Sequence, residues 1–469
     1  MILGAAMAAP YAVPRRYCLR QYAPLFYQSF FLLHVFYRRV RHTSLMKIAY
    51  HFLGCRLNEA ENEQIAREMA AHGHEMVALE DAPDVIILNT CGVTCDAMRK
   101  SRNLARRMAA LHPKLLVLMG CAIDLMASGE HPVEDDELIE DCEKDITIVR
   151  ILRDDRKNAS SIVLKNIEKI EAQQPNEKAA YQLRMRSFIK IQDGCNNQCS
   201  YCAVRLARGR ERSENANDII DEIQKCLDLG EKEIVLTGVQ LGAWHEADHR
   251  LSWLIEQILE RTSVQRLRLS SIEPWHVRPE LWELWKDKRL CPHFHIPVQS
   301  GSNDVLAAMR RRTPIEGYLE KLAAIRECIP GVRISTDLIV GFPGETDEMW
   351  HETLEFIERA QFDDAHLFRF SPRPNTIAAS LPHPVPADIK RQRWNEAQER
   401  IQTIQRRRLE NAVGTLCHVL WETPVKTLGN QVCWQGYSEH YLKLMRWFDK
   451  PMRGVITEEV FGQGDDTAL

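Results

Sequence analysis

The sequence predicts an α/β protein in three parts: a parallel-sheet domain over residues 46–165, a partial barrel over 183–405 and a small β domain over 406–469. Apolar runs alternate with amphipathic stretches through three repeats and then through six. Such alternation is typical of parallel sheets. The end of the chain has short strand-like runs between turn residues instead. The composition, with 45% apolar and 27% charged residues, is that of an ordinary globular protein.

Residues 1–45 differ from the rest of the chain. They contain six arginines and no Asp or Glu, so the net charge of −4 divides into +6 here and −10 in the remainder. Such a segment fits an organellar transit peptide or a peripheral membrane anchor. We favour a start codon set too far upstream, because Met46 opens a strand-like run. We therefore set this doubtful N-terminal extension aside from the fold.

The first domain alternates strands and helices from residue 47 onward. Residues 47–53 form the first predicted strand, and continuous apolar runs at 85–88 and 115–119 predict two buried parallel strands. Residues 58–72 and 96–111 have helical periodicity between them. The acidic residues after this unit predict a solvated surface segment, and polar residues over 166–182 predict an interdomain linker.

Three cysteines follow these three strands. Cys55, Cys91 and Cys121 each lie just past a strand end beside a glycine. The carboxyl ends of parallel strands meet at one edge of a sheet, so the three thiols should converge there. Buried free cysteines are common, but they usually lie within strands or helices. The pattern therefore predicts a metal or cluster site, with Cys95 excluded because it falls in the first turn of the next helix.

A second group of cysteines lies in one short loop. Cys195, Cys199 and Cys202 have C-x3-C-x2-C spacing directly after the strand predicted at 187–192. Structural zinc usually takes four ligands from paired C-x2-C elements. Three thiolates without a nearby fourth ligand leave an open position, as in a [4Fe–4S] cluster that exposes one iron. This loop therefore predicts an open cluster.

Six βα units follow this loop and predict a partial TIM-type barrel, whose functional loops lie at the strand carboxyl ends. The other predicted strands are 233–236, 266–269, 293–298, 333–340 and 364–370. Small or polar residues at four of these ends favour a pocket for a polar cofactor, although each alone is ordinary turn chemistry. We expect the pocket to include Tyr201, Gly238, Gln240, Ser271, Glu273, Gln299, Ser300 and Asp337.

These motifs resemble a known family. Cys195, Cys199 and Cys202 match the signature of radical S-adenosylmethionine (SAM) enzymes, and the three cysteines of the first domain match the N-terminal domain of methylthiotransferases. Residues 46–460 resemble that family's plan, which ends in a small TRAM β-barrel. The resemblance implies two [4Fe–4S] clusters, each with an open iron, and SAM as cofactor. It also implies a reducing, cytoplasmic location, because disulfides would destroy the ligand sets.

Several stretches look most like the enzymes that methylthiolate threonylcarbamoyladenosine in tRNA. They are residues 89–94, 190–195, 208–213, 236–239 and 270–274. Three departures concern the pocket and the RNA contacts. The family usually has Pro where Val204-Arg205 lie, often has Tyr-Ala-Gln in place of residues 122–124, and usually has Gly where this chain has Asn375.

The resemblance implies a radical mechanism. The barrel cluster would bind SAM and cleave it by electron transfer to a 5′-deoxyadenosyl radical, which attacks the C2–H bond of adenine. Acid–base side chains cannot break this unactivated bond, so the cofactor performs the difficult chemistry. The cluster on Cys55, Cys91 and Cys121 would offer sulfur, and a second SAM would supply the methyl group. The two sites should therefore face one another.

The implied partners are tRNA, through an anticodon-loop adenosine, and a reductant protein such as flavodoxin or ferredoxin. We expect a monomer without membrane attachment. Sister enzymes that act on isopentenyladenosine or on a ribosomal-protein aspartate are the near alternatives. A non-catalytic RNA-binding protein with structural iron–sulfur or zinc is the alternative from another class.

The net charge offers no global basic field for RNA, so local basic sites would have to form a track. Candidates are residues 99–107, 205–212, 310–312 and 406–408. In the C-terminal part, Trp434, Tyr437 and Tyr441 could stack on bases, but core packing is the more ordinary role. The eight cysteines outside the two sets default to packing or surface positions: Cys18, Cys95, Cys142, Cys226, Cys291, Cys328, Cys417 and Cys433.

Overall fold

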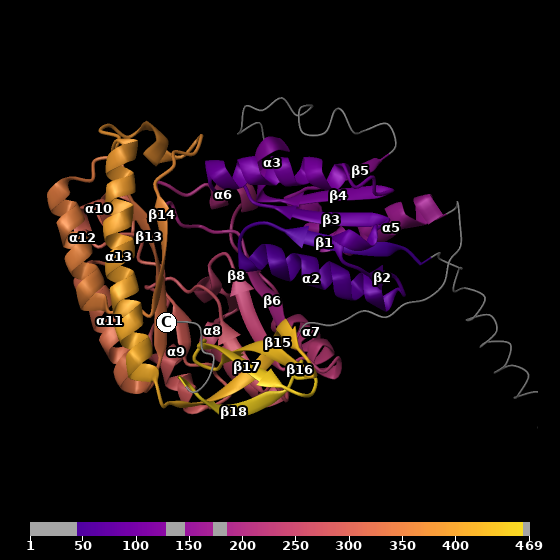
Figure 1. Cartoon of the computed structure of the whole chain (residues 1–469). Coiled ribbons are helices and arrows are strands. Elements are labelled where there is room, and N and C mark those ends of the chain that lie inside the picture. Colours follow the sequence, from indigo (N-terminus) through magenta and orange to yellow (C-terminus); the bar gives the residue numbers. More distant parts are fainter. Residues whose placement is uncertain (1–44, 128–145, 172–184, 463–469) are drawn as a thin grey trace, which may run out of the picture.

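A computed structural model describes residues 45–127, 146–171 and 185–462 (Figure 1). The predicted extension, apart from Leu45, and most of the acidic segment lie outside the described residues. The first domain is a five-stranded parallel sheet in the order β2-β1-β3-β4-β5. Its strands are β1 (Lys47–Phe52), β2 (Glu75–Met76), β3 (Val85–Thr90), β4 (Leu115–Gly120) and β5 (Thr147–Ile151).

Helices cover both faces of this sheet, and β3 and β4 are therefore buried at every position. Ile86 and Leu88 pack toward α3 and α4, and Val85 and Ile87 pack toward α2 and α5. The helices are α2 (Arg56–Ala71), α3 (Cys95–Ala109), α4 (Cys121–Ala127) and α5 (Ala159–Glu171).

Periodicity missed part of this domain. It did not predict β2, which has two residues, or β5, whose alternating pattern is mostly solvent-accessible. The expected linker start at residue 166 is also wrong, because α5 continues to Glu171. Val163 and Ile167 are buried on one face of that helix, and this apolar stripe is why the helix continues into the polar stretch.

The barrel contains the six predicted strands, all paired in parallel. Their order is β6-β8-β11-β12-β13-β14, with isolated parallel bridges joining β11 to β12. The prediction of an open barrel is confirmed, although β12 is shorter than the 293–298 run suggested. The strands are β6 (Arg186–Asp193), β8 (Glu233–Gly238), β11 (Arg266–Leu269), β12 (His293–His295), β13 (Arg333–Val340) and β14 (Asp364–Arg369).

Helices surround the outside of the barrel, and their buried faces form one large apolar core with the strands. Figure 1 shows α10, α11, α12 and α13 beside β13 and β14. The main helices are α7 (Ala216–Asp228), α8 (Leu251–Arg261), α10 (Asn303–Ala308), α11 (Ile315–Cys328), α12 (Asp347–Ala360) and α13 (Ala387–Ala412). The expected domain limit at 405/406 thus falls inside α13. No helix of the described ranges is long and apolar enough to cross a membrane.

The first domain docks on the β6 side of the barrel through α2 (Figure 1). Ala60 of α2 packs against Phe188 of β6 and Val235 of β8. Glu63 accepts a hydrogen bond from the backbone N–H of Phe188 at 3.0 Å. This contact positions the cysteine-bearing edge of the sheet beside the loop that follows β6.

The C-terminal part is an antiparallel four-stranded sheet in the order β17-β16-β15-β18, which confirms a small β domain. Trp421 and Trp434 pack in its core, so Trp434 has the ordinary role. Tyr437 and Tyr441 stack on one another and cover the guanidinium of Arg186 of the barrel. The strands are β15 (Leu416–Leu428), β16 (Gln431–Ser438), β17 (Lys443–Phe448) and β18 (Ile456–Val460).

Candidate active site

The structure brings Cys55, Cys91 and Cys121 together at the carboxyl edge of the first sheet. Cys55 precedes the first turn of α2, Cys91 follows β3, and Cys121 begins α4. Gly54 has φ of +113°, and a Cβ there would lie 2.8 Å from the Cβ and 3.0 Å from the Sγ of Cys91. Only glycine therefore allows the loops that carry Cys55 and Cys91 to approach so closely.

Polar contacts hold these loops in place. The backbone N–H of Cys91 donates to Ser101 Oγ at 3.0 Å, and Ser101 Oγ donates back to the Cys91 carbonyl at 2.8 Å. Asn58 Nδ2 donates to the Thr90 carbonyl at 3.0 Å. Burial raises the pKa of Cys91 to about 12 and raises that of Cys121, and each nearby thiol adds to the shift.

Cys195, Cys199 and Cys202 lie on the loop after β6. Ser200, between the last two, donates its backbone N–H to the Met309 carbonyl at 3.1 Å and accepts from the N–H of Ala378 at 2.8 Å. The loop is thus fixed to two distant segments of the barrel. Burial raises the pKa of Cys195 to about 11 and that of Cys202 to about 12.

The spacing of the thiols fits iron–sulfur clusters better than single ions. A single tetrahedral zinc at 2.3 Å from each sulfur needs sulfurs roughly 3.8 Å apart. Over the described ranges, the group of three whose ligand atoms all lie within 4.8 Å of one another is His295, Asp337 and His366, and neither cysteine set is so compact. Sulfurs that bind different irons of one cluster lie farther apart, so the wider spacing of each set agrees with a cluster rather than a single ion.

Three of the expected cofactor residues lie directly beside the barrel thiols. Gln240 Oε1 accepts a hydrogen bond from Cys195 Sγ at 3.4 Å. Glu273 accepts from Arg311 at 2.6 Å, and Arg311 opposes the rise that burial causes in the pKa of Cys199. Burial also raises the pKa of Tyr201, whose ring lies near the same arginine and cysteine. The six residues form one polar cluster.

The other expected pocket residues lie at neighbouring strand ends. A Cβ at Gly238 would lie 3.0 Å from Gln192, so the backbone approaches closely there. Ser271 forms a parallel bridge with His295. Gln299 has φ of +82° and donates its N–H to the Asp337 carbonyl. Ser300 is buried, and its Oγ accepts a hydrogen bond from the Ser302 N–H at 3.2 Å. This hydroxyl therefore stabilises the local turn.

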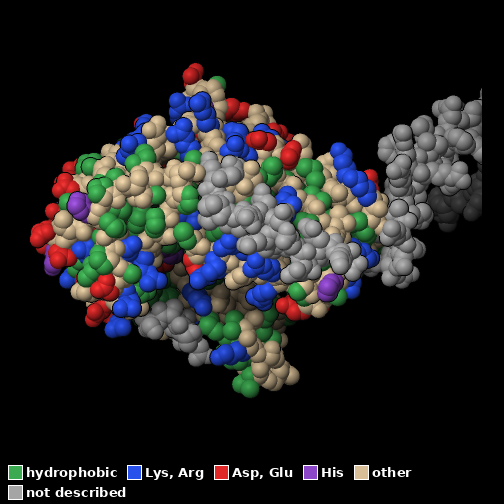
Figure 2. Space-filling view, turned by 90° about the horizontal axis from the view of Figure 1, so that it is seen from above, with side chains coloured by type: hydrophobic (Ala, Val, Ile, Leu, Met, Phe, Trp, Pro, Cys, Tyr) green, Lys and Arg blue, Asp and Glu red, His purple; other side chains and the backbone are tan. Residues whose placement is uncertain are grey.

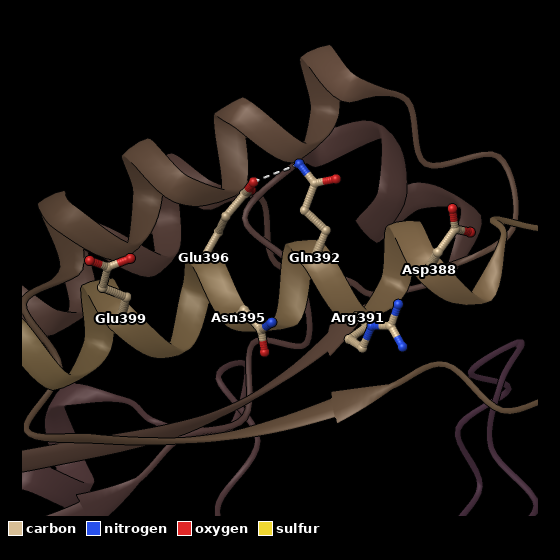
Figure 3. A pocket seen from close by; sticks show the side chains of 6 residues that line it. All are labelled: Asp388, Arg391, Gln392, Asn395, Glu396 and Glu399. Carbon is tan, nitrogen blue, oxygen red and sulfur yellow. Dashed lines mark hydrogen bonds between the residues drawn. The ribbon is translucent and has the colours of Figure 1, made fainter.

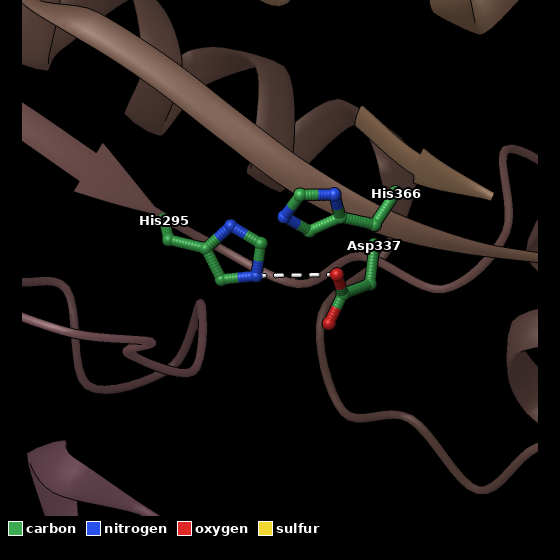
Figure 4. Close-up of side chains that lie close together, drawn as sticks. All are labelled: His295, Asp337 and His366. Atoms are coloured by element: carbon green, nitrogen blue, oxygen red, sulfur yellow. Dashed lines mark ion pairs between the residues drawn. The ribbon is translucent and has the colours of Figure 1, made fainter. Parts of the chain in front are cut away.

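Asp337 belongs to a group that the sequence did not reveal. It lies on β13 between His295 of β12 and His366 of β14 (Figure 4). His295 Nε2 is 3.2 Å from Asp337 Oδ1, while His295 Nδ1 contacts Ser335 Oγ at 2.9 Å. No sequence motif marks this group, because its three side chains come from positions far apart in the chain.

The burial of two arginines corrects the predicted basic sites for RNA. Arg208 is 1% exposed and Arg311 has a side chain that is 2% exposed, so neither is available to RNA. Arg208 reaches Cys121, and Arg311 reaches Glu273. The sequence offered one signal, since Arg208 closely follows Cys202 in the chain. The basic sites predicted at 205–212 and 310–312 instead placed both arginines among exposed neighbours.

The remaining arginines and cysteines have ordinary positions. On the face seen in Figure 2, Lys and Arg side chains form several separate groups among other side chains. Arg408 is paired with Asp363 at 2.6 Å, whereas Arg406 and Arg407 are exposed. The twelve described cysteines include four that are buried outside the two thiol sets: Cys226, Cys291, Cys417 and Cys433. Cys95 lies in the first turn of α3, as expected, and Cys18 and Cys142 lie outside the described residues.

Two surface hollows lie apart from the thiols. One of about 390 Å³ runs along α13 and is lined by side chains of that helix alone, including Asp388 and Glu399 (Figure 3). A smaller one of about 170 Å³ is lined by Arg156, Lys190 and Asp193 among others, behind the Arg208 group. Neither hollow is lined by a cysteine, and both are lined mainly by charged side chains. The candidate active site is therefore placed at the cysteine-bearing edges.

Comparison with known proteins agrees with this geometry. Residues 189–357 match the Radical SAM superfamily, and residues 47–135 match a family described as "Uncharacterized protein family UPF0004". The radical SAM methyltransferase TsrM from Kitasatospora setae shares the fold, with a TM-score of 0.51 and 12% identity over 71% of this chain and 77% of that one. The barrel and its three-cysteine loop therefore define a radical SAM enzyme.

Relatives of similar sequence show which kind of radical SAM enzyme this is. "Threonylcarbamoyladenosine tRNA methylthiotransferase MtaB" of Bacillus subtilis is 31% identical, covering 88% of this chain and 92% of that protein. The protein of the same name from Thermotoga maritima is 33% identical, covering 83% and 89%. "tRNA-2-methylthio-N(6)-dimethylallyladenosine synthase" of Moorella thermoacetica is 32% identical, covering 81% and 88%. The chain belongs to the radical SAM methylthiotransferase family, which confirms the family predicted from its motifs.

Proposed function

We propose that this enzyme converts N6-threonylcarbamoyladenosine next to the tRNA anticodon to its 2-methylthio derivative. One observation carries the proposal: a single buried arginine joins the two sets of three thiols, which come from two different domains. Arg208, which follows the barrel set, contacts Cys121 of the other set at 3.2 Å. Sulfur insertion at an unactivated carbon needs a radical source and a sulfur source close together, and this arrangement meets that need.

The six cysteines would hold two [4Fe–4S] clusters. Cys195, Cys199 and Cys202 fit the cluster that, when bound, reductively cleaves SAM to start radical chemistry. Cys55, Cys91 and Cys121 fit a second cluster, which would supply sulfur. The chain's own part is to fix the loops that carry both thiol sets and to bury Cys91 and Cys121.

The pocket beside the barrel thiols would bind SAM. Gln240, Glu273 and Tyr201 supply polar groups there, and Gly238 lets the backbone approach Gln192 closely. The strand ends around them complete the proposed set with Ser271, Gln299, Ser300 and Asp337. Asp337, with its two histidines, lies where it could contact either SAM or the substrate base.

The substrate tRNA would bind across the exposed basic side chains and the C-terminal sheet. We propose that this sheet is a TRAM domain and that it begins after α13 ends at Ala412, with the barrel starting near 185. A small reductant protein such as flavodoxin or ferredoxin would supply electrons to a monomer in the cytoplasm. Reversing the charges of Arg310, Arg312, Arg406 and Arg407 tests the RNA surface, and unchanged tRNA affinity would refute it.

Nucleoside mass spectrometry of tRNA from a deletion strain tests the substrate. Loss of methylthio-threonylcarbamoyladenosine, with restoration by the intact gene, is the expected result. The relatives that carry the dimethylallyladenosine name, at 30–32% identity, make methylthiolation of isopentenyladenosine the second candidate. If the methylthio derivative of isopentenyladenosine disappears instead, the second candidate is correct.

Anaerobic reconstitution separates an enzyme from a non-catalytic RNA-binding protein. Two clusters correspond to about eight irons per chain. We expect this content together with SAM cleavage under reducing conditions. Zinc in place of iron, or iron without SAM cleavage, would support the non-catalytic alternative. Separate Ala substitutions of the two thiol sets should each leave about four irons.

A further inference from the structure

We propose that Arg208 is a positioning residue that tunes the N-terminal cluster from the barrel side, by donating a hydrogen bond to the sulfur of Cys121. The inference rests on the proposed ligand set Cys55, Cys91 and Cys121. Arg208 is the last residue of α6 (Val204–Arg208), which follows the barrel thiols directly. Its Nε lies 3.2 Å from Cys121 Sγ, so one domain supplies a cation to the metal site of the other.

The orientation of this guanidinium is fixed on every side. Its NH1 group donates to Glu61 at 2.9 Å and to Asp193 at 3.1 Å, and its NH2 group donates to Asn58 at 2.7 Å. A guanidinium has five donors in one plane, so these contacts leave Nε–H pointing at the sulfur. The side chain is 2% exposed, which means that water does not compete for these bonds.

The same guanidinium also reaches the loop of the barrel thiols. Asp193 Oδ1, one of its acceptors, accepts from the backbone N–H of Gly194 at 2.8 Å, and Cys195 is the next residue. Arg208 therefore connects the sulfur of one set with the turn that begins the other. Loss of this residue should loosen the relative position of the two sites as well as remove a charge.

A cation that donates to a cluster thiolate stabilises the reduced, more negative state of the cluster. Hydrogen bonds to the sulfurs and local charge are established determinants of cluster potential. Glu61 and Asp193 near the site would act in the opposite sense, and Arg208 lies between them and the sulfur. The barrel set has a separate cation, because Arg311 lies beside Cys199. Each cluster would thus be tuned by its own buried arginine.

Redox titration followed by electron paramagnetic resonance tests this assignment. The parent is the full chain with Cys195, Cys199 and Cys202 changed to Ala, so that only the N-terminal cluster loads. Arg208→Gln should make its potential more negative by about 59 mV, a tenfold change in the one-electron equilibrium. Arg208→Lys keeps the charge but loses Nε–H, and we expect a smaller shift in the same direction. Arg212→Gln is the matched control, because Arg212 is half-exposed and contacts Asp193 without touching a thiol.

The reciprocal parent, with Cys55, Cys91 and Cys121 changed to Ala, shows whether the effect is specific. There Arg311→Gln should shift the barrel cluster, while Arg208→Gln should shift its potential much less than it shifts that of the N-terminal cluster. Loaded Arg208→Gln and Arg208→Lys chains that both titrate like the parent would overturn the inference. Equal shifts of both clusters would do the same, since that result indicates a general structural effect. A first parent that holds no iron would instead overturn the proposed ligand set, and the inference with it.

Discussion

Glu233 of β8 accepts two hydrogen bonds from Arg268 of β11, at 2.8 and 3.3 Å, in a fully buried site. Arg186 and Arg266 approach the same carboxylate at 3.1 and 2.6 Å. Tyr441 of the C-terminal sheet lies over the Arg268 guanidinium at 4.6 Å. One buried carboxylate therefore organises the three arginines on which the C-terminal sheet docks.

Replacing this carboxylate should destabilise the protein. Glu233→Gln leaves Arg266 and Arg268 without their anion, while Arg186 keeps Glu422. Breaking a buried ion pair in this way costs about 3–5 kcal/mol. Burial alone would raise the pKa of Glu233, but the three arginines outweigh burial and hold the pKa below its usual range. The contribution should therefore persist above the usual carboxyl pKa and disappear only in strong acid.

Denaturant unfolding near neutral pH measures this loss. Glu256→Gln, on the exposed face of α8, is the control and should change the free energy of unfolding little. Limited proteolysis should cleave the C-terminal sheet faster in Glu233→Gln. Equal unfolding free energies for the two variants would contradict the role given to Glu233.

His293 should make stability depend on pH. It is half-buried, stacks on Tyr441 with ring centroids 4.9 Å apart, and has a pKa well below its usual value, mainly because of desolvation. Below about pH 6.5 the His293 imidazole binds a proton in the unfolded chain but remains neutral in the folded chain. Stability should therefore fall from pH 8 to 5.5, and His293→Phe should reduce that fall. His351→Phe, at an exposed site, should leave it unchanged.

Gly120 should be required for the N-terminal thiol site. It has φ of +102°, and a Cβ there would lie within 2.6 Å of Thr90 and Asn89. Gly120→Ala should therefore displace Cys121 and reduce iron after reconstitution from about eight to about four per chain. Gly344→Ala is the control, because Gly344 has φ of +84° with open space around it. It should keep its iron and lose only the roughly 1–2 kcal/mol of left-handed strain.

Asn375 explains one departure from the family pattern. Its φ is +60°, a left-handed conformation that glycine adopts freely and Asn tolerates. Asn375→Gly should thus change the melting temperature little. Asn375→Val should cost about 1–2 kcal/mol, because a β-branched residue is strained there. Equal melting temperatures for the two variants would show that this turn is not held in the left-handed region.

The repetitive parts of the fold were predictable because their signal is local. Buried runs such as 85–88 and 115–119 have the period and composition of parallel strands, and glycines mark where those strands end. The failures have equally local causes. The strand β2 is too short to show a period, and α5 hides its apolar stripe within a polar stretch.

By itself, the sequence determined the two thiol sets, because cysteines at strand ends and in one short loop express their chemistry through spacing alone. Only the tertiary structure decided the roles of Arg208 and Arg311, which sequence analysis assigned to an RNA surface. Whether a guanidinium is buried depends on the carboxylates and thiols that distant segments bring to it. Glu61 and Cys121 contact Arg208 from another domain, and no periodicity in the sequence predicts these contacts.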